Sequence, residues 1–283
     1  MRIEYKYLFS VEHLNQLRQI ISPFVEYDSF TLKQPLKEYI VRSIYLDTPK
    51  LDYYYKKISG LNNRKKLRIR GYDKLDDEQP VFLEIKRKNG VRSYKNRFPV
   101  LYNDLPPLFI TGNVEEFTLK MNDKVLDDGK KFFFNYYRNA VHPSVLIVYN
   151  REAYLDKANP RIRITLDKDL RFFAFPGLDD LYKEDNLRYV IPGRFILEVK
   201  FDHNLPFWFK EVRKKFDLKR LSASKYNMCL DTHYRINKIE KLKKKSYLNN
   251  IFETELHLNR TKEDARRISK YSESFFNSRR GCS

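Results

Sequence analysis

Hydrophobic and polar residues alternate with a period of two along much of the chain. Seven runs rich in β-branched and aromatic residues are separated by Gly, Asp, Asn or Pro, at residues 39–47, 66–72, 81–88, 93–100, 145–155, 161–173 and 195–201. Runs of this kind are typical of β-strands joined by turns. With a short strand at the N-terminus, the pattern predicts about eight strands in an antiparallel sheet.

Other segments have the longer period of an amphipathic helix. Apolar residues recur at helical spacing from Leu14 to Ile21, Ser10 can cap this helix, and Pro23 ends it. Further helices are expected at residues 114–139, from Pro206 through Lys219, and from Ala223 towards Leu242, the last capped by Ser222. The fold class is therefore α+β, with helices around the sheet and a helical C-terminal portion.

Length and composition indicate a globular protein with an unusual charged surface or interior. The 283 residues are 42% hydrophobic and 15% aromatic, too apolar for a disordered chain, yet 33% are charged. We interpret residues 1–239 as one main domain and residues 240–283, rich in Lys and Arg, as a basic, partly helical appendage.

The net charge of +19, from 56 Lys and Arg against 37 Asp and Glu, indicates a polyanionic partner. Nucleic acid, an anionic membrane and a phosphate-rich small molecule all fit that charge. Two cysteines, no apolar leader at the N-terminus and no charge-free stretch approaching about 18 residues favour a cytoplasmic protein without a transmembrane segment. A membrane-associated partner stays open.

The strands carry their charges on one face. Because residues i, i+2 and i+4 of a strand share a face, Lys66, Arg68 and Arg70 lie on one side and Leu67 and Ile69 on the other. The same alternation recurs in five more segments, with the charged or polar positions Glu84 and Lys86, Lys95 and Arg97, Tyr149 and Arg151, Arg161 and Arg163, and Glu198 and Lys200.

A solvated outer face is the ordinary interpretation of one such strand, but the repetition favours a shared charged surface. Like charges opposite each other on neighbouring strands destabilise a sheet, so a multivalent anion is needed to neutralise them. If about eight strands close into a barrel, the interior is wide enough for side chains and one slender ligand. A phosphate chain has that shape and charge.

The triplet Glu-x-Lys, at Glu4, Glu84 and Glu198, places a carboxylate beside a cation on three strands. Cross-strand ion pairing is one interpretation; the other is that a carboxylate holds Mg²⁺ or Mn²⁺, hard ions that take oxygen ligands and are often shared with substrate phosphates. The chain has no phosphate-binding glycine loop, no dinucleotide fingerprint and no nucleophile elbow, and its five histidines lack metal-ligand spacing.

Together these motifs resemble the polyphosphate polymerase (VTC, vacuolar transporter chaperone) domain of the triphosphate tunnel metalloenzyme or CYTH-like superfamily. The resemblance covers roughly residues 2–235. It is carried by the segments YKY at 5–7, SIYLDT at 43–48, KLRIR at 66–70, FLEIK at 82–86, RIRITLD at 161–167, ILEVK at 196–200 and SKY at 224–226.

The resemblance implies an antiparallel, eight-stranded closed β-barrel that binds a triphosphate through inward Lys and Arg. It implies transfer of the γ-phosphate of ATP to a growing polyphosphate chain, with pyrophosphate or polyphosphate as acceptor and Mn²⁺ or Mg²⁺ as cofactor. The implied catalytic cations are Arg68, Arg70, Lys86, Arg151, Arg163 and Lys200; the implied substrate contacts are Lys6, Lys95, Arg97, Tyr149, Ser224 and Lys225; the implied metal ligand is Glu198. Two residues before Ser224, where the family has a further cation, this chain has Ser222. Lys219 or Arg220 could take the place of that cation.

Two alternatives use the same face. Water could replace the phosphate acceptor, which would make the protein a triphosphatase, or the domain could be a non-catalytic module that binds polyphosphate or inositol phosphates. Nucleic acid is not expected as the partner, because the aromatic residues mostly do not share a strand face with the cations and no nucleic-acid-binding motif is present.

Overall fold

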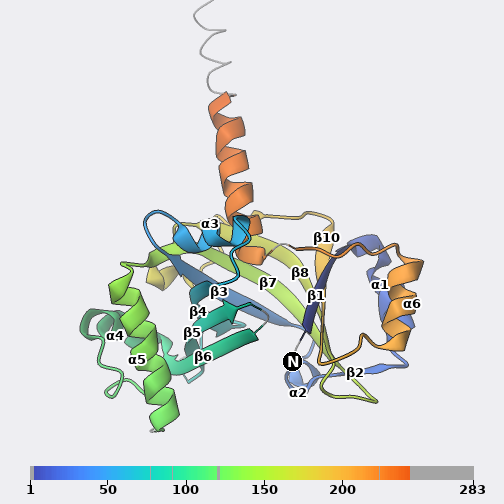
Figure 1. Ribbon diagram of the computed structural model, residues 1–283, viewed down its shortest axis with the longest axis horizontal. Helices are drawn as coiled ribbons and strands as arrows, with labels where there is room; N and C mark the ends of the chain where they lie inside the picture. The colour runs from blue at the N-terminus through green and yellow to red at the C-terminus, as the bar shows by residue number, and fades with distance from the viewer. Residues whose placement is uncertain (1–2, 77, 91, 120–121, 223, 243–283) are drawn as a thin grey trace, which may run out of the picture. The chain divides into compact units, whose positions relative to one another are not determined.

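The computed structural model describes residues 3–76, 78–90, 92–119, 122–222 and 224–242 (Figure 1). The chain divides into two units, Met1–Asp231 and Thr232–Ser283. The sheet and its flanking elements belong to the first unit. Of the predicted appendage 240–283, all but residues 240–242 lie outside the described residues.

One antiparallel sheet dominates the first unit. Its strands follow the order β1-β10-β8-β7-β3-β4-β5-β6, with β2 paired to β7 and β9 paired to β8. The strands are β1 Ile3–Ser10, β2 Val25–Tyr27, β3 Tyr39–Asp47, β4 Arg64–Tyr72, β5 Pro80–Asn89, β6 Arg92–Leu101, β7 His142–Asp156, β8 Arg163–Ala174, β9 Arg188–Tyr189 and β10 Arg194–Phe201. All eight predicted strands are present. The extra strands β2 and β9 have three and two residues, too few to show a period.

The helices are short and lie outside the sheet (Figure 1). The α-helices are α1 Leu14–Ile21, α2 Ser29–Lys33, α3 Asp52–Ile58, α4 Leu105–Thr111, α5 Asp123–Arg138 and α6 Phe207–Lys215, and the 3-10 helices are η1 Val11–His13, η2 Tyr102–Asp104 and η3 Leu178–Asp180. Residues 225–231 of the first unit and residues 232–242 of the second are also helical. Ser10 accepts a hydrogen bond from the amide of Glu12 and so caps η1, the turn that leads into α1, whereas α1 itself begins after His13 without a side-chain cap.

Three helix predictions need correction. The middle helix begins only at Asp123, after the separate helix α4, and α6 ends at Lys215 rather than Lys219. Ser224, not Ser222, caps the helix that follows, because its hydroxyl accepts a hydrogen bond from the amide of Asn227 at 3.2 Å. A serine hydroxyl three residues before the amide is the usual N-cap geometry, so either serine satisfied the sequence pattern.

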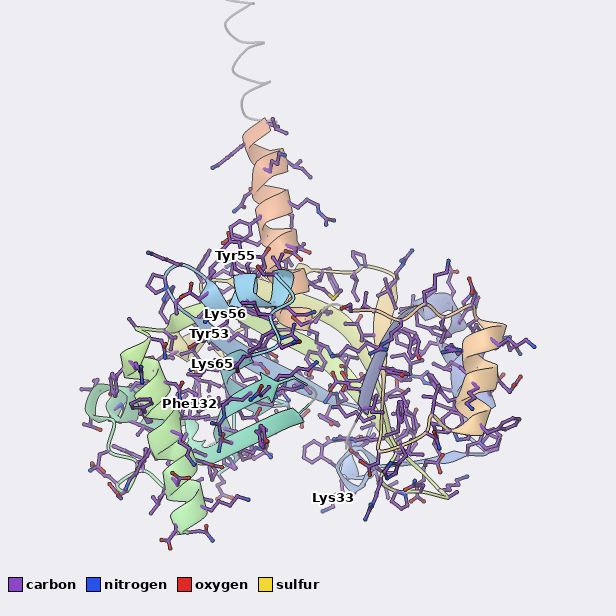
Figure 2. All side chains as sticks on the ribbon, viewed as in Figure 1. Lys33, Tyr53, Tyr55, Lys56, Lys65 and Phe132 are labelled. Atoms are coloured by element: carbon purple, nitrogen blue, oxygen red, sulfur yellow. The ribbon has the colours of Figure 1, made fainter. Side chains whose placement is uncertain are left out.

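Two hydrophobic clusters lie between the sheet and the helices. One packs apolar residues of β3 to β6, among them Leu67 and Leu83, against Phe132 of α5, which Figure 2 labels. The other packs apolar residues of β1, β8 and β10, such as Leu197, against Leu17 of α1 and Phe209 of α6. Each fully buried Leu or Phe contributes about 1.5–3 kcal/mol relative to an exposed one. This helix-covered surface is the outer face of the sheet, and the opposite surface is its inner face.

The expected closed barrel is wrong: the sheet curls but does not close. β1 and β6 stand at the two ends of the strand order and are not paired with each other. The free edge of β1 is instead occupied by residues 220–221, through an isolated bridge between Tyr7 and Arg220 and a 2.7 Å hydrogen bond from the amide of Leu221 to the carbonyl of Lys6. The curl still brings side chains together, since Lys86 Nζ of β5 lies 3.6 Å from Glu4 Oε2 of β1.

No helix in the described part of the chain is both long enough and apolar enough to cross a membrane.

Candidate functional site

Charged side chains line the inner face of the curled sheet. They stand in register on neighbouring strands: Lys6 is opposite Glu198, Arg68 opposite Glu84, Arg151 opposite Asp167, and Lys86 opposite both Lys66 and Lys95. Since side chains alternate along a strand, the apolar neighbours of these residues fill the outer clusters. An inner face of this kind excludes a hydrophobic core and is suited to a charged ligand.

Glu84 is the centre of one ion-pair group. Its carboxylate lies 2.6 Å from Arg68 Nη2, 2.7 Å from Lys95 Nζ and 3.2 Å from Arg97 Nε. Burial would raise the pKa of Glu84, but Arg68, Arg70 and Lys95 outweigh it and hold this pKa well below its usual range. Both Lys95 and Arg97 therefore reach the inner face, where they pair with the Glu84 carboxylate.

Glu198 and Glu4 form a second group. Lys200 Nζ lies 2.5 Å from Glu198 and 3.8 Å from Glu4, while Lys6 contacts Glu4 and lies 3.6 Å from Glu198. Glu198 is only 4% exposed. Its burial favours the neutral acid, yet the charges of Lys200, Lys6 and Lys225 lower its pKa well below the usual value. The pKa of Glu4 is lowered as well, against its burial and the charge of Glu198, by Lys6, Lys86 and Lys200.

Asp167 holds a third group, which joins the sheet to the helix at residues 225–231. Arg151 donates to its carboxylate through Nε at 2.6 Å and through Nη2 at 2.8 Å, and Lys225 forms an ion pair with the same carboxylate. Tyr149 lies beside both cations: Arg151 Nη2 donates to its hydroxyl at 3.2 Å, and Lys225 Nζ lies 4.8 Å from its ring centroid. Burial alone would lower the pKa of Lys225, but Asp167 raises it.

Arg163 lies apart from these three groups. Its Nη2 is 2.8 Å from Asp28, just before α2, and 3.3 Å from the hydroxyl of Tyr39. Arg161, which shares the strand pattern with Arg163, precedes β8, and its Nη1 is 3.9 Å from Asp202. The structure therefore places Arg163 at the inner face with a carboxylate partner that strand periodicity did not reveal.

Lys66 and Arg70 have no ion-pair partner among the described residues. Lys66 Nζ donates to the Ser224 hydroxyl at 2.8 Å and lies 5.2 Å from the ring centroid of Tyr226, and Arg70 Nε donates to the hydroxyl of Ser43 at 3.1 Å. Burial, with the charges of Lys6, Lys86 and Lys57, lowers the pKa of Lys66 to about 7. These two cations have the most to gain from a bound anion.

Tyr45 was not singled out from the sequence, although it belongs to the inner face. Its hydroxyl accepts a 2.9 Å hydrogen bond from Arg68 Nη1, and its ring stacks on Tyr226 with centroids 5.1 Å apart. Burial opposes ionisation of this phenol, but Arg68, Arg70 and Lys66 together lower its pKa to about 7. A polar residue in alternation with Ile44 and Leu46 was the available signal, and it does not distinguish Tyr45 from an ordinary core tyrosine.

Ser224 stands at the N-terminus of the helix that carries Lys225. Its hydroxyl donates to Asn227 Oδ1 at 2.5 Å while it accepts from Lys66. Arg220, a candidate for the missing cation before Ser224, packs its guanidinium 4.0 Å above the ring of Tyr5. Tyr5 alternates with the inner-face residues Glu4 and Lys6, so Arg220 lies on the other side of β1.

The carboxylates fit a hard divalent cation only in part. Glu198 and Glu4 are anionic and close to the same lysines, and Mg²⁺ commonly takes one or two protein carboxylates together with substrate phosphates. Within the described ranges no group of three or more His, Cys, Asp or Glu could hold a metal ion by itself. Such an ion would therefore need oxygen ligands from a phosphate substrate or water.

Comparison with known proteins adds a family match. A family model described as the VTC domain matches residues 1–234. Subunit 4 of the vacuolar transporter chaperone complex of Schizosaccharomyces pombe is 27% identical over 214 residues, covering 61% of this chain and 28% of that protein. Subunit 2 of the complex of Saccharomyces cerevisiae is 23% identical over 158 residues, covering 50% of this chain and 19% of that protein. The chain thus matches less than a third of the length of these two relatives.

Solved structures show weaker likeness. A putative adenylate cyclase from Bacillus halodurans is 13% identical with a TM-score of 0.46, and the match covers 79% of this chain and 94% of that protein. A putative adenylyl cyclase from Hippeastrum, described as having a dominant triphosphatase activity, is 13% identical with a TM-score of 0.45, and the match covers 80% of this chain and 93% of that protein. At these TM-scores the likenesses add nothing to the family match.

Proposed function

The chain belongs to the VTC domain family, and on this premise we propose that it is a polyphosphate polymerase that transfers the γ-phosphate of ATP to the end of an inorganic polyphosphate chain. Pyrophosphate would serve as the first acceptor. The site would be the inner face of the sheet.

The observation that carries the proposal is the excess of cations over carboxylates on that face. Glu84, Glu4, Glu198 and Asp167 each contact two or more cations, and Lys66 and Arg70 still have no carboxylate among the described residues. A surface with this imbalance is stabilised by a multivalent anion, because every phosphate oxygen can replace a contact that the carboxylates share. A polyphosphate chain supplies such oxygens at regular spacing.

The chemistry needs charge stabilisation and alignment rather than a base. The attacking terminal oxygen of a phosphate chain is already ionised, so in-line transfer requires little proton abstraction. Arg68, Arg70, Arg151 and Arg163 offer planar forks for phosphate oxygens. Lys6, Lys86, Lys200 and Lys225 offer point charges that can stabilise the negative charge as it passes from the attacking phosphate oxygen to the oxygen of the departing ADP. None of the inner-face residues named above is a histidine.

In this proposal Glu198, with Glu4 beside it, would hold Mg²⁺ or Mn²⁺ together with phosphate oxygens. A cation held there would supply positive charge to the phosphate oxygens. The chain's own lysines would orient the substrate, and Lys200, which contacts both carboxylates, would keep them ionised.

The test incubates the purified full chain with ATP, Mn²⁺ and a trace of pyrophosphate, and resolves the products on a urea gel stained for polyphosphate. The proposal expects a ladder that disappears on digestion with an exopolyphosphatase. Glu198→Gln should abolish the ladder and retain binding of tripolyphosphate, measured by calorimetry. Glu26→Gln, an exposed position on β2, is the matched control and should keep the ladder.

Each other outcome identifies an alternative. Free phosphate without a ladder would make the protein a triphosphatase, with water as the acceptor. Binding of tripolyphosphate without any turnover, in Mn²⁺ or in Mg²⁺, would make it a binding module. Normal activity of Glu198→Gln would remove this residue from the metal site.

A further inference from the structure

A separate cavity lies on the outer face of the sheet. Its volume is about 900 Å³, within the range of small-molecule sites. Its floor follows one row of the sheet, in which Arg42 of β3 is opposite Val148 of β7, and Val148 is opposite Arg171 of β8. Arg42 alternates with the inner-face residues Ser43 and Tyr45 of β3, so the cavity and the proposed polymerase site lie on opposite faces.

Three residues that line the cavity carry buried polar atoms without a hydrogen-bond partner in the described part of the chain. They are Arg42 Nη1, Arg171 Nε and Asn150 Oδ1. Arg42 is only 3% exposed. A buried polar atom without a partner costs free energy, and a guanidinium group costs more than a neutral one. Two arginines with unpaired donors beside one cavity therefore favour an anionic ligand there.

Glu184 marks where the anionic part of that ligand would bind. Its Oε2 accepts from Arg171 Nη1 at 2.9 Å, and its Oε1 accepts from Arg42 Nη2. The Glu184 carboxylate thus occupies the position between two arginines that the anionic group of a ligand could take. Because the Glu184 side chain is 49% exposed, it can leave this position more easily than a buried residue could.

Two tyrosines form an aromatic wall. The rings of Tyr102 and Tyr182 meet edge to face with centroids 5.1 Å apart, and the Arg42 guanidinium lies 5.8 Å from the ring centroid of Tyr182. Tyr182 can approach the sheet because Gly71, opposite Arg42, has no side chain: a Cβ there would lie 2.5 Å from the Tyr182 hydroxyl oxygen. Lys74 also lines the cavity and adds positive charge, whereas the lining residue Lys183 is paired with Asp179 at 3.1 Å and Asp180 at 2.6 Å.

We propose that this cavity is a second anion site that binds a phosphate monoester of a planar ring, with the phosphate between Arg42 and Arg171 in place of the Glu184 carboxylate and the ring against Tyr102 and Tyr182. Two guanidinium groups match the oxygens of one phosphate, and aromatic side chains prefer to pack edge to face or offset against another ring.

Isothermal titration of the full chain with phenyl phosphate tests this proposal. Arg171→Gln should weaken binding about tenfold or more, since it removes one charged fork. Glu184→Gln should strengthen binding several-fold, because the competing carboxylate is gone and the arginines remain. Arg163→Gln on the inner face is the matched control and should leave the affinity unchanged, which separates this cavity from the site of the proposed function.

Several results would overturn the proposal. They are equal affinities of the wild type and Arg171→Gln, a loss of binding in Arg163→Gln, and weaker binding in Glu184→Gln than in the wild type. Arg171→Lys, which keeps the positive charge, tests whether a loss in Arg171→Gln comes from misfolding: it should fold as the wild type does and bind with intermediate affinity. Inorganic phosphate that binds as tightly as phenyl phosphate would disprove a role for the ring.

Discussion

The hydroxyl of Tyr226 donates a hydrogen bond to Oδ2 of Asp47, and both residues are buried. The same carboxylate accepts hydrogen bonds from three backbone amides: that of Thr48 at 2.7 Å, and those of Tyr53 and Tyr54, in the first turn of α3, at 2.9 Å each. Tyr226 follows Ser224 and Lys225 and stacks on Tyr45 of the inner face. Asp47 therefore ties two helix starts to the sheet, and through Tyr226 it helps to position Ser224 and Lys225.

Tyr226→Phe should destabilise the protein by about 1.5–3 kcal/mol, the usual contribution of a hydrogen bond to a charged group. Urea unfolding would measure the loss. The affinity for tripolyphosphate should fall several-fold in the same variant, because Lys225 is less firmly held. Tyr55→Phe, which removes a hydroxyl from an exposed tyrosine of α3 (labelled in Figure 2), is the control and should change the stability by less than about 0.5 kcal/mol.

Arg68→Ala should weaken tripolyphosphate binding by about 1.5–3 kcal/mol, roughly 10- to 150-fold. The residue contacts Glu84 and Tyr45 on the inner face and presents a planar fork to phosphate. Arg87→Ala removes the same group from β5 at an exposed position, where Arg87 donates to Asn96. Calorimetry should find the affinity of this control within about twofold of the wild type, and equal losses in both variants would contradict a specific role for Arg68.

Binding of a polyanion should protonate Lys66. With a pKa of about 7 in the free protein, its amine is largely neutral at pH 8, whereas a nearby phosphate raises that pKa towards the ordinary lysine value. Tripolyphosphate binding at pH 8 should therefore take up about one more proton in the wild type than in Lys66→Arg, whose guanidinium is always charged. The difference should vanish below about pH 6, where Lys66 is already protonated.

Calorimetric titrations in two buffers with different ionisation enthalpies would count these protons. Comparison with Lys66→Arg removes the contribution from the ligand. Because the charge of Lys66 itself lowers the pKa of Tyr45, both proteins are also compared in the Tyr45→Phe background, which removes the contribution of this phenol. Equal proton uptake by the two proteins at pH 8 would show that Lys66 does not face the bound phosphate.

Gly71→Ala should destabilise the fold by about 1–3 kcal/mol, as overpacking typically does, because the new Cβ would lie 2.5 Å from the hydroxyl oxygen and 2.9 Å from Cζ of Tyr182. The free energy of unfolding of the double variant Gly71→Ala, Tyr182→Ala should fall by at least about 0.5 kcal/mol less than the sum of the losses in the two single variants, since the clash is then absent. Strict additivity in urea unfolding would show that the Tyr182 ring does not pack on β4.

The sequence by itself determined which residues share a face of each strand. A period of two leaves no other choice, so Arg68 and Arg70 had to be separated from Leu67 and Ile69, and each predicted strand was found. The cations assigned to a common site also followed from this alternation and from the family motifs. Short elements such as β2 and α2 could not be predicted, because three to five residues do not complete a period that can be recognised.

Only the tertiary structure decided how the strands combine. The sheet stays open, and residues 220–221, far along the chain, occupy the edge of β1 that a barrel would have given to β6. Asp28 reaches Arg163 and Asp47 reaches Tyr226 across separations of 135 and 179 residues, and Arg42 and Arg171 meet at one carboxylate. Contacts of this kind depend on chain reversals and packing rather than on a local period, so they appear only once the whole sheet has formed.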